Sequence, residues 1–315
     1  MKFSDILIIP KMSKYEWDLS RYHLQPRQLI SKYKREGLDS DRVLESHERQ
    51  KESLRAVSLV FRSAKFISRE SLNWKLSNQA KLVIALGGDN HFQYVSHFVH
   101  KTWMLGINSD PIRSDGALIT FTTKDLEDLA NAIEKDRFGV EEWTRLEVIL
   151  NGKRLPSLSV SEVFMGEEIR SNMSRHRISY GKHSEVQKCS GLLVSTGAGS
   201  TGWYDAACRY LFKNGNSFPK TRKAFNFLAT EPYHGRLSHT SLLHGTIRNG
   251  GLIVNSLNDS KGVLMMDAIE EHDFKEGSVA RIRRGTALKV LTLKGTSGNY
   301  DGPREGQLGP MARSE

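Results

Sequence analysis

The chain has 315 residues, of which 38% are hydrophobic and 26% are charged, a composition typical of a soluble globular protein with two domains. Its two cysteines, Cys189 and Cys208, exclude a disulfide-rich secreted scaffold and favour a reducing compartment. No apolar run approaches the roughly twenty residues of a membrane helix, and the acid at Asp5 argues against a targeting peptide. We therefore expect a cytoplasmic protein with no membrane partner.

The formal net charge of +10 arises from 46 Lys and Arg residues against 36 Asp and Glu residues. Nucleic acid would require clustered cations with aromatic platforms between them. Basic and acidic residues instead alternate through Lys14–Glu52, and Arg281–Arg284 lies in a strand-like stretch without aromatic residues. The pattern favours a basic surface for an anionic small ligand over a nucleic-acid interface.

The first 125 residues predict an open α/β domain. Ile6–Pro10, Lys81–Leu86 and Met104–Asn108 are short apolar runs of the kind that form buried parallel strands. Ser40–Ala64 lacks Gly and Pro and predicts a long helix, and Thr123–Glu134 carries apolar residues at helical spacing. Strands that alternate with helices are typical of an α/β layer structure.

Residues 126–294 predict a second, β-rich domain similar to a β-sandwich, so the expected fold class is α/β plus all-β. Short β-prone runs alternate with turn residues, and one helix is expected at Thr201–Lys213. The tail, residues 295–315, is rich in Gly, Pro and polar residues and predicts disorder. The β-prone runs are Leu146–Leu150, Ser159–Phe164, Leu192–Ser195, Leu252–Ser256, Gly262–Met266, Ala280–Arg283 and Leu288–Leu293.

The first motif with chemical meaning is Gly87-Gly88-Asp89-Asn90, which directly follows the apolar run Leu82–Leu86. Open α/β folds bind ligands at the carboxyl end of such a strand. The glycines let backbone N–H groups approach a phosphate, and Asp89 beside them is able to hold a metal or accept a hydroxyl proton. The same triplet also ends many strands as an ordinary turn, so alone it is a weak signal.

The second motif is a loop rich in glycine and hydroxyl groups between the apolar run Gly191–Val194 and the predicted helix. Free N–H groups, hydroxyls and the positive end of the helix dipole converge there, as in an anion or ribose site. A tight strand-to-helix connection is the simpler alternative, but it requires fewer glycines and hydroxyls. The candidate binding residues are Ser195, Thr196, Gly199, Ser200, Thr201, Trp203 and Tyr204.

Two such motifs in this order resemble the NAD kinase family, in which Gly-Gly-Asp-Gly precedes Gly-Ser-Thr-Ala-Tyr by about a hundred residues. In detail the chain is most similar to the mitochondrial-type branch, over about residues 1–293. The segments that carry this resemblance are Lys14–Trp17, Arg21-Tyr22, Gly106–Pro111, Arg113-Ser114, Ser161–Glu167, Ser190–Leu192, Trp203 and Glu231-Pro232.

The resemblance implies an N-terminal α/β domain, a C-terminal β-rich domain and a substrate between them. It implies transfer of the γ-phosphoryl of ATP, with Mg²⁺, to the 2′-hydroxyl of the adenosine ribose of NAD, by a homodimer or larger homo-oligomer. By resemblance, Asp89 is the catalytic aspartate, Glu162 binds ribose hydroxyls, Thr201–Tyr204 hold the dinucleotide and Asn108 is the asparagine after the third strand. A secondary hydroxyl is a poor nucleophile until a carboxylate takes its proton, so the retained Asp89 suits this chemistry.

The chain departs from the family pattern at two positions of the expected site. Asn90 stands where the family has glycine, and Ser161 stands where an asparagine contacts the base. These departures leave three alternatives open: a tolerated variant, a related kinase with another nucleoside or sugar acceptor, and a nucleotide-binding protein without turnover. The sequence also leaves open whether ATP or polyphosphate is the donor.

The histidines and aromatic residues outside these motifs predict structural roles. His97 and His100 are three residues apart near His91, but no Cys or Asp completes a set of ligands at zinc-type spacing, so no metal ligands are predicted. Around the Glu231-Pro232 turn, surface or substrate-facing histidines are expected at 234, 239 and 244. The two cysteines are expected to be reduced packing residues, and core aromatic residues are expected at Phe225, Phe227 and Tyr233.

Overall fold

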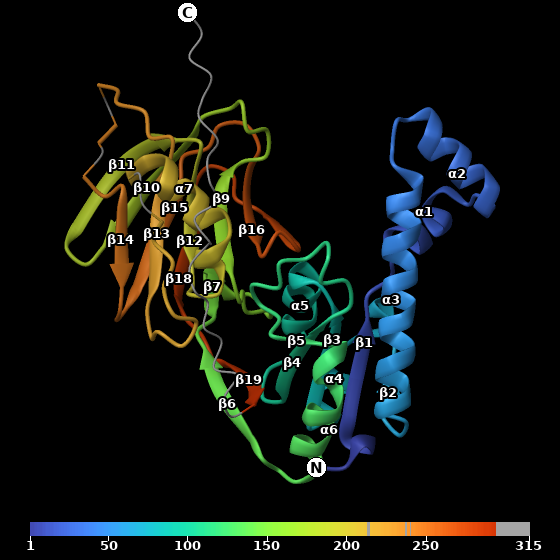
Figure 1. The fold of residues 1–315 in the computed structure, drawn as a ribbon. Coiled ribbons are helices and arrows are strands. Elements are labelled where there is room, and N and C mark those ends of the chain that lie inside the picture. The colour runs from blue at the N-terminus through green and yellow to red at the C-terminus, as the bar shows by residue number, and fades with distance from the viewer. Residues whose placement is uncertain (213–214, 237, 240, 294–315) are drawn as a thin grey trace, which may run out of the picture.

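A mainly parallel β-sheet lies at the centre of the N-terminal part of the computed structural model, which describes residues 1–212, 215–236, 238–239 and 241–293 (Figure 1). The strand order is β2-β1-β3-β4-β19-β6, and β5 pairs with β4. Every residue of β3 is buried, as expected for a strand with both faces of its sheet covered. The strands are β1 (Ile6–Pro10), β2 (Lys65–Phe66), β3 (Leu82–Gly87), β4 (Trp103–Asn108), β5 (Phe121–Thr122), β6 (Phe138–Trp143) and β19 (Leu288–Leu293).

Helices cover the two faces of this sheet. Alternate residues of β1 point to opposite faces. Ile6 and Ile8 pack with α3 (Ser40–Val60) and α6 (Leu126–Glu134). On the other face, Leu7 and Ile9 pack in the cluster that includes α5 (Asp89–Ser96). Near this second face lies α4 (Trp74–Gln79), while α1 (Lys14–Tyr22) and α2 (Pro26–Arg35) contact α3.

In the described residues, two antiparallel six-stranded sheets form a β-sandwich. Their strand orders are β11-β10-β15-β18-β7-β8 and β14-β13-β12-β9-β16-β17. The inner faces share one core, in which Ile178 and Leu252 of the first sheet pack with Leu192 and Phe225 of the second. The strands are β7 (Leu146–Leu150), β8 (Lys153–Arg154), β9 (Glu162–Glu167), β10 (Ser174–Tyr180), β11 (His183–Cys189), β12 (Gly191–Ser195), β13 (Phe225–Thr230), β14 (His244–Ile247), β15 (Gly251–Ser256), β16 (Gly262–Met266), β17 (Glu270–Asp273) and β18 (Val279–Arg284).

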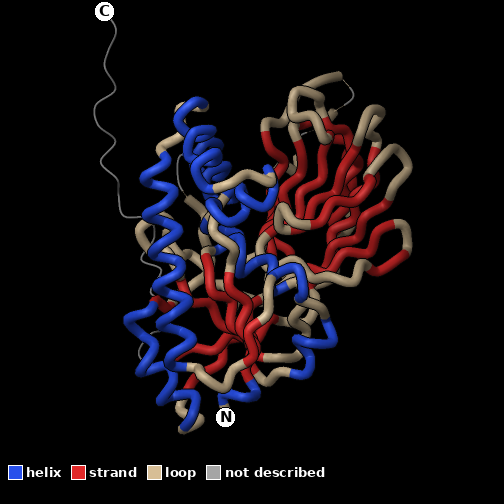
Figure 2. The backbone as a smooth tube through the Cα atoms, turned by 90° about the vertical axis from the view of Figure 1, so that its right-hand side faces the viewer, coloured by secondary structure: helices blue, strands red, loops and turns tan. Residues whose placement is uncertain are grey.

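The chain passes twice between the first sheet and the sandwich. It leaves through β6 and returns through β19, and these two strands pair with each other while Val290 of β19 pairs with Met104 of β4. Figure 2 shows the helix-rich part and the sandwich side by side. The domain limits expected at residues 125 and 294 stay predictions, and the expected tail, 295–315, lies outside the described residues.

The structure confirms the predicted fold class and most predicted elements, with small changes at their ends. The long helix ends at Val60, and the helix expected at Thr201–Lys213 begins at Trp203 as α7 (Trp203–Phe212), after a 3₁₀ turn. Phe225 and Phe227 are core residues as predicted, but Tyr233 is 53% exposed, so that prediction is wrong. Within the described residues, no helix is long and apolar enough to cross a membrane.

Candidate nucleotide site

The Gly-Gly-Asp turn lies where β3 ends and α5 begins. Gly88 is the N-cap of α5, and Asp89 is the first residue of the helix. A Cβ atom on Gly88 would lie 2.9 Å from the hydroxyl oxygen of Ser114, so a larger residue there would require this side chain to move. The turn therefore keeps backbone N–H groups at the carboxyl edge of the sheet open to an anionic ligand.

Asp89 is half-buried and held by two backbone donors. Its Oδ2 accepts a hydrogen bond of 2.9 Å from the N–H of Ala117, and its Oδ1 accepts one of 2.9 Å from Leu118. The carbonyl of Ala117 in turn accepts a hydrogen bond of 2.6 Å from the ammonium of Lys220. Each carboxylate oxygen keeps a lone pair for a ligand, and the two N–H donors fix its orientation.

A cavity of about 430 Å³ opens beside this turn and collects several predicted site residues. Lys11, Lys14 and Arg113 supply three cations to its lining. Burial lowers the pKa of Lys11, and the neighbouring Arg69 and Arg113 lower it further. A cavity with this charge suits phosphate groups. Its other lining residues are Ser46, Gln50, Gly88, Asp89, Asn90, Asn108, Ser109, Asp110 and Ser114.

Asn108 and Asn90 reach the same cavity in different ways. Asn108 is buried, and its amide donates to the carbonyl of Ser114 at 3.1 Å and accepts from the N–H of Asp110 at 3.1 Å. It therefore shapes the cavity wall. Asn90 is exposed and lies within the first turn of α5, with no positive φ angle among the described residues at this position. Asn90 has a helical backbone conformation, because the helix has already begun there.

The hydroxyl groups of the second motif are turned into the protein. The Thr196 hydroxyl donates to the carbonyl of Val160 at 2.6 Å, and the Ser200 hydroxyl donates to that of Gly197 at 2.8 Å. The Ser195 hydroxyl donates to the Thr196 carbonyl at 3.1 Å. All three side chains are buried, so they shape the loop, and their role as ligand-binding groups stays a prediction.

Close packing also explains the glycine at position 199. A Cβ atom there would lie 2.2 Å from the carbonyl oxygen of Ser161, which is backbone and has no room to move. Thr201 is half-buried and donates to the Ala198 carbonyl at 3.3 Å. The second motif is thus packed directly onto the segment that contains Ser161 and Glu162.

The two aromatic residues predicted to hold a dinucleotide have different surroundings. Trp203 is half-buried against Phe164, with ring centroids 5.1 Å apart. Tyr204 is only 2% exposed, and its hydroxyl accepts a hydrogen bond of 3.1 Å from the Asn226 amide. Tyr204 therefore contributes to the core under α7, while Trp203 keeps part of its ring accessible.

Ser161 and Glu162 lie where β9 begins. Burial, with a smaller effect from Asp267, raises the pKa of Glu162 to about 7. The Ser161 hydroxyl is buried and accepts a hydrogen bond of 2.8 Å from the amide of Gln93 on α5. In addition, Val160 and Ala198 pack in the same apolar cluster as α5. The two sequence motifs thus meet along this helix.

Sequence reasoning missed several residues of the site. Lys11 directly follows β1, and its position after an apolar run was a usable signal, whereas Arg113, beyond the end of β4, was named only as part of the family resemblance and given no role. Gln93, Lys220 and Asp267 had no local signal, because each reaches the site through a contact distant in the sequence. His91, which had been considered for metal binding, is buried against the carbonyl of Ile9 at 2.8 Å. The described residues contain no group of three or more His, Cys, Asp and Glu side chains suited to a metal ion.

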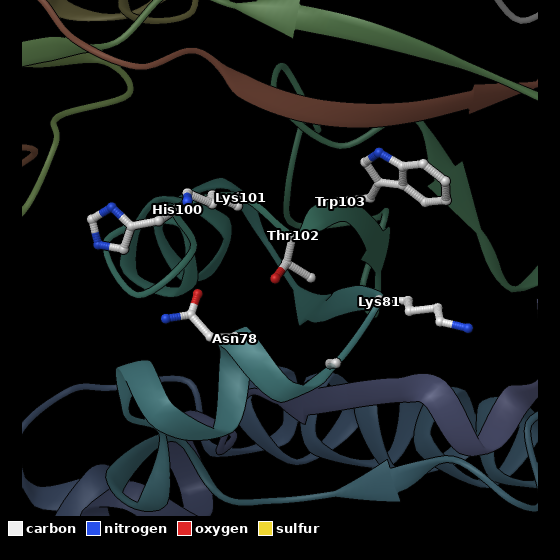
Figure 3. Close-up of a pocket in the computed structure, with 7 residues that line it drawn as sticks. Asn78, Lys81, His100, Lys101, Thr102 and Trp103 are labelled. Atoms are coloured by element: carbon white, nitrogen blue, oxygen red, sulfur yellow. The ribbon is translucent and has the colours of Figure 1, made fainter.

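A second hollow, of about 610 Å³, lies away from these motifs. In Figure 3 its lining side chains come from the end of α4, the loop after α5 and the starts of β3 and β4. This is the amino-terminal edge of the parallel strands, opposite to the edge that carries Asp89. The labelled residues are Asn78, Lys81, His100, Lys101, Thr102 and Trp103.

The arrangement of an α/β domain and a β-sandwich defines the class of protein by its fold, which is the NAD kinase fold. A solved NAD kinase from Archaeoglobus fulgidus in complex with ATP covers 92% of this chain and 93% of its own, with a TM-score of 0.59 and 16% identity. Yeast NADH kinase complexed with NADH covers 78% of this chain and 74% of its own, with a TM-score of 0.60 and 14% identity. These two structures establish the fold.

Sequence comparison extends this result, although no protein-family model matches the chain. A probable NADH kinase of Oryza sativa subsp. japonica is 27% identical over 258 residues, which are 71% of this chain and 78% of the rice protein. The human mitochondrial NAD kinase 2 is 23% identical over 252 residues, 64% of this chain and 57% of the human protein. The NAD kinase of Staphylococcus aureus strain JH9 is 30% identical over 138 residues, half the length of that protein. The chain is therefore similar in sequence to NAD kinases and NADH kinases and shares their fold, in agreement with the resemblance carried by its motifs.

Proposed function

We propose that the protein is an ATP-dependent kinase that transfers the γ-phosphoryl of ATP to the 2′-hydroxyl of the adenosine ribose of NAD, giving NADP. The observation that carries this proposal is the position of Asp89, whose oriented carboxylate lines a cavity with three cations. The similarity to NAD kinases and NADH kinases supports the same reaction. The relatives include both NAD kinases and NADH kinases, so NADH is a second acceptor to test.

In this proposal, the phosphoryl donor ATP binds in the cavity next to Gly88. Its phosphates bind the cations of Lys11, Lys14 and Arg113, together with the free N–H groups at the start of α5. A neighbouring hollow of about 230 Å³, which shares Lys11 with this cavity, is lined by the apolar side chains of Leu54 and Leu86 and offers room for a base. The proposed donor therefore lies across the carboxyl ends of β1, β3 and β4.

The proposal includes Mg²⁺ as a cofactor. The side-chain oxygens of Asp89 and Asn90 line the cavity that receives the phosphates, and Mg²⁺ usually takes one or two protein oxygens with phosphate and water. The residues present therefore fit the ion. Bound Mg²⁺ neutralises charge on the phosphates during phosphoryl transfer.

The acceptor ribose lies on the other side of Asp89. Glu162 accepts hydrogen bonds from ribose hydroxyls, and Trp203 offers a half-accessible ring at the end of the glycine-rich loop. Asp89 takes the proton of the 2′-hydroxyl as its oxygen attacks the γ-phosphorus. The bond from that phosphorus to the bridging oxygen breaks, and ADP leaves with the bonding electron pair.

Two further properties belong to the same proposal. The family resemblance implies a homo-oligomer, and the sequence composition predicts a cytoplasmic protein, whereas one relative is a mitochondrial enzyme. Light scattering of the purified protein tests the first property. Fractionation of the native cells tests the second.

The decisive experiment incubates the purified full chain with ATP, Mg²⁺ and either NAD or NADH, and measures NADP or NADPH. Parallel reactions replace ATP by polyphosphate and the acceptor by a panel of nucleosides and sugars. The proposal requires phosphorylated dinucleotide from ATP. Activity on another acceptor alone would instead identify a related kinase, and binding of NAD without any transfer would identify a nucleotide-binding protein.

A further inference from the structure

One face of α5 connects the two halves of the site. Asp89, Gln93 and His97 follow one another at intervals of four residues, a spacing that keeps side chains on one side of a helix. Asp89 lines the phosphate cavity, and Gln93 donates to the Ser161 hydroxyl at 2.8 Å. His97, at the C-cap of the helix, contacts the β-sandwich.

His97 is buried between two carboxylates of the sandwich. Its Nε2 lies 2.8 Å from Oδ2 of Asp267, and its Nδ1 lies 2.9 Å from Oε1 of Glu270. The His97 side chain is 2% exposed and the Asp267 side chain is 0% exposed. Burial alone would lower the pKa of His97, but the two carboxylates outweigh burial and raise it to about 9. The imidazolium therefore donates from both nitrogens at neutral pH.

Asp267 links His97 to the residues at the start of β9. Its Oδ1 accepts hydrogen bonds from the backbone N–H groups of Ser161 at 2.9 Å and Glu162 at 2.8 Å, and from the Ser159 hydroxyl at 2.6 Å. Its Oδ2 accepts from the N–H of Val160 at 2.8 Å. The Asp267 carboxylate thus accepts a hydrogen bond from every residue of the segment 159–162, which ends with Glu162.

We propose that the buried pair of His97 and Asp267 positions Glu162 relative to Asp89. The pair joins the end of the helix that begins with Asp89 to the segment that carries Glu162. This inference rests on the proposed function, in which both carboxylates act on one ribose. His97 and Asp267 are positioning residues, since neither contacts the cavity.

The energetics favour such a role over simple packing. A buried carboxylate with four protein donors is costly to leave without its counter-ion. Losing the imidazolium would therefore disturb the segment that Asp267 holds. A second cation, Arg145, fixes the same end of α5 by donating to the Val99 carbonyl at 2.6 Å. We therefore expect the helix end to stay in place when His97 is changed.

The test compares His97→Gln with a matched control, His100→Gln. His100 lies three residues further on, and its ring packs at a tilt against Trp74 with centroids 4.1 Å apart. Its side chain has no contact with the segment 159–162 among the described interactions. Hydrogen exchange by mass spectrometry is measured on both variants without any ligand. We expect peptides that cover residues 159–163 to exchange at least about tenfold faster in His97→Gln alone.

Ligand affinity provides the second readout, measured by calorimetry well below the melting temperature of each variant. The Kd for NAD should rise about tenfold in His97→Gln while that for ATP stays within about twofold, because only the acceptor uses Glu162. If the pair only stabilised the fold, His97→Gln would raise the Kd values for NAD and ATP to the same extent. Unchanged exchange of residues 159–163 in a folded His97→Gln protein, or equal losses for ATP and NAD, would overturn the proposal.

Stability against pH gives a readout that requires no ligand. A raised pKa in the folded state stabilises it fully below the unfolded value of about 6.5, and this contribution disappears as pH rises through about 9. The difference in unfolding free energy between wild type and His97→Gln should follow that course. The charged groups around His97 are Asp267, Glu270, His272, Arg145 and Glu162. If the wild-type protein forms no NADP, the proposed function is wrong. Hydrogen exchange and stability against pH require no ligand, so they still test the role of the pair of His97 and Asp267.

Discussion

The ammonium of Lys220, which follows the sandwich helix α7, donates a hydrogen bond of 2.6 Å to the carbonyl of Ala117 in the N-terminal part. Ala117 is one of the two residues whose N–H groups hold the carboxylate of Asp89. The ammonium also lies 4.4 Å from the ring centroid of Trp143. A cation from one half of the protein thus supports the loop that orients the proposed base in the other half.

Replacing Lys220 by Met should therefore lower kcat more than it raises the KM for either substrate. A hydrogen bond from a charged donor is worth about 1.5–3 kcal/mol, so we expect a loss of roughly ten- to a hundredfold in kcat/KM. Lys223→Met, at an exposed position three residues away, serves as the control and should retain wild-type kinetics. Equal kinetics for the two variants would remove Lys220 from the site.

Asp89→Asn should abolish phosphoryl transfer and leave nucleotide binding within a few-fold. The amide preserves the shape of the side chain but does not take a proton, and loss of a general base costs about 10²–10⁴ in rate. Asp115→Asn, on the exposed loop nearby, is the matched control. Single-turnover kinetics with NAD measure the effect, and a wild-type rate would refute the assignment of Asp89.

Glu162→Ala should weaken binding of the ribose-bearing acceptor more than binding of ATP. Charge-assisted hydrogen bonds to two hydroxyls contribute about 1.5–3 kcal/mol, which corresponds to roughly a ten- to hundredfold loss of affinity. Titration calorimetry with each nucleotide separates the two effects. The same loss for ATP and NAD would place Glu162 outside the acceptor site.

The raised pKa of Glu162 also predicts a dependence on pH. The carboxyl binds its proton more tightly in the folded state, so it costs stability as pH rises from about 4.5 to about 7. Glu162→Gln should therefore be more stable than wild type at pH 8, by up to about 3 kcal/mol, and equally stable below pH 4. Denaturant unfolding at several pH values measures the difference in unfolding free energy between Glu162→Gln and wild type. A difference that does not change with pH would contradict this prediction.

Restoring the family residues tests the two departures from the pattern. Asn90 is exposed in a regular helical turn, so Asn90→Gly should change activity toward NAD by less than about tenfold and cost up to about 1 kcal/mol of stability. If Asn90 and Ser161 are both tolerated variants, the double variant with Ser161→Asn should also change activity toward NAD by less than about tenfold. A gain on NAD with a loss on another acceptor would instead show that these residues define a different substrate.

Local patterns in the sequence were sufficient for the fold class and for the position of Asp89 at the end of a buried strand. The apolar run before Gly87 predicted a buried strand, and Asp89 was expected at its carboxyl end, where the structure places it. The helices α1 and α2 were missed, because their apolar faces are short and pack in a small cluster with α3. The hydroxyls of Thr196 and Ser200 have the composition of a binding loop, yet they bond inside the protein.

Sequence by itself indicated many of the strands and the glycine turns that follow them, since periodicity and φ freedom are properties of neighbouring residues. Only the tertiary structure decided which distant side chains complete the site. Lys220 reaches Ala117 across 103 positions, and Asp267 reaches Glu162 across 105. Such contacts depend on how the sheet and the sandwich pack together. The residues that meet in these contacts are therefore decided by three-dimensional packing and cannot be read from any short stretch of the sequence.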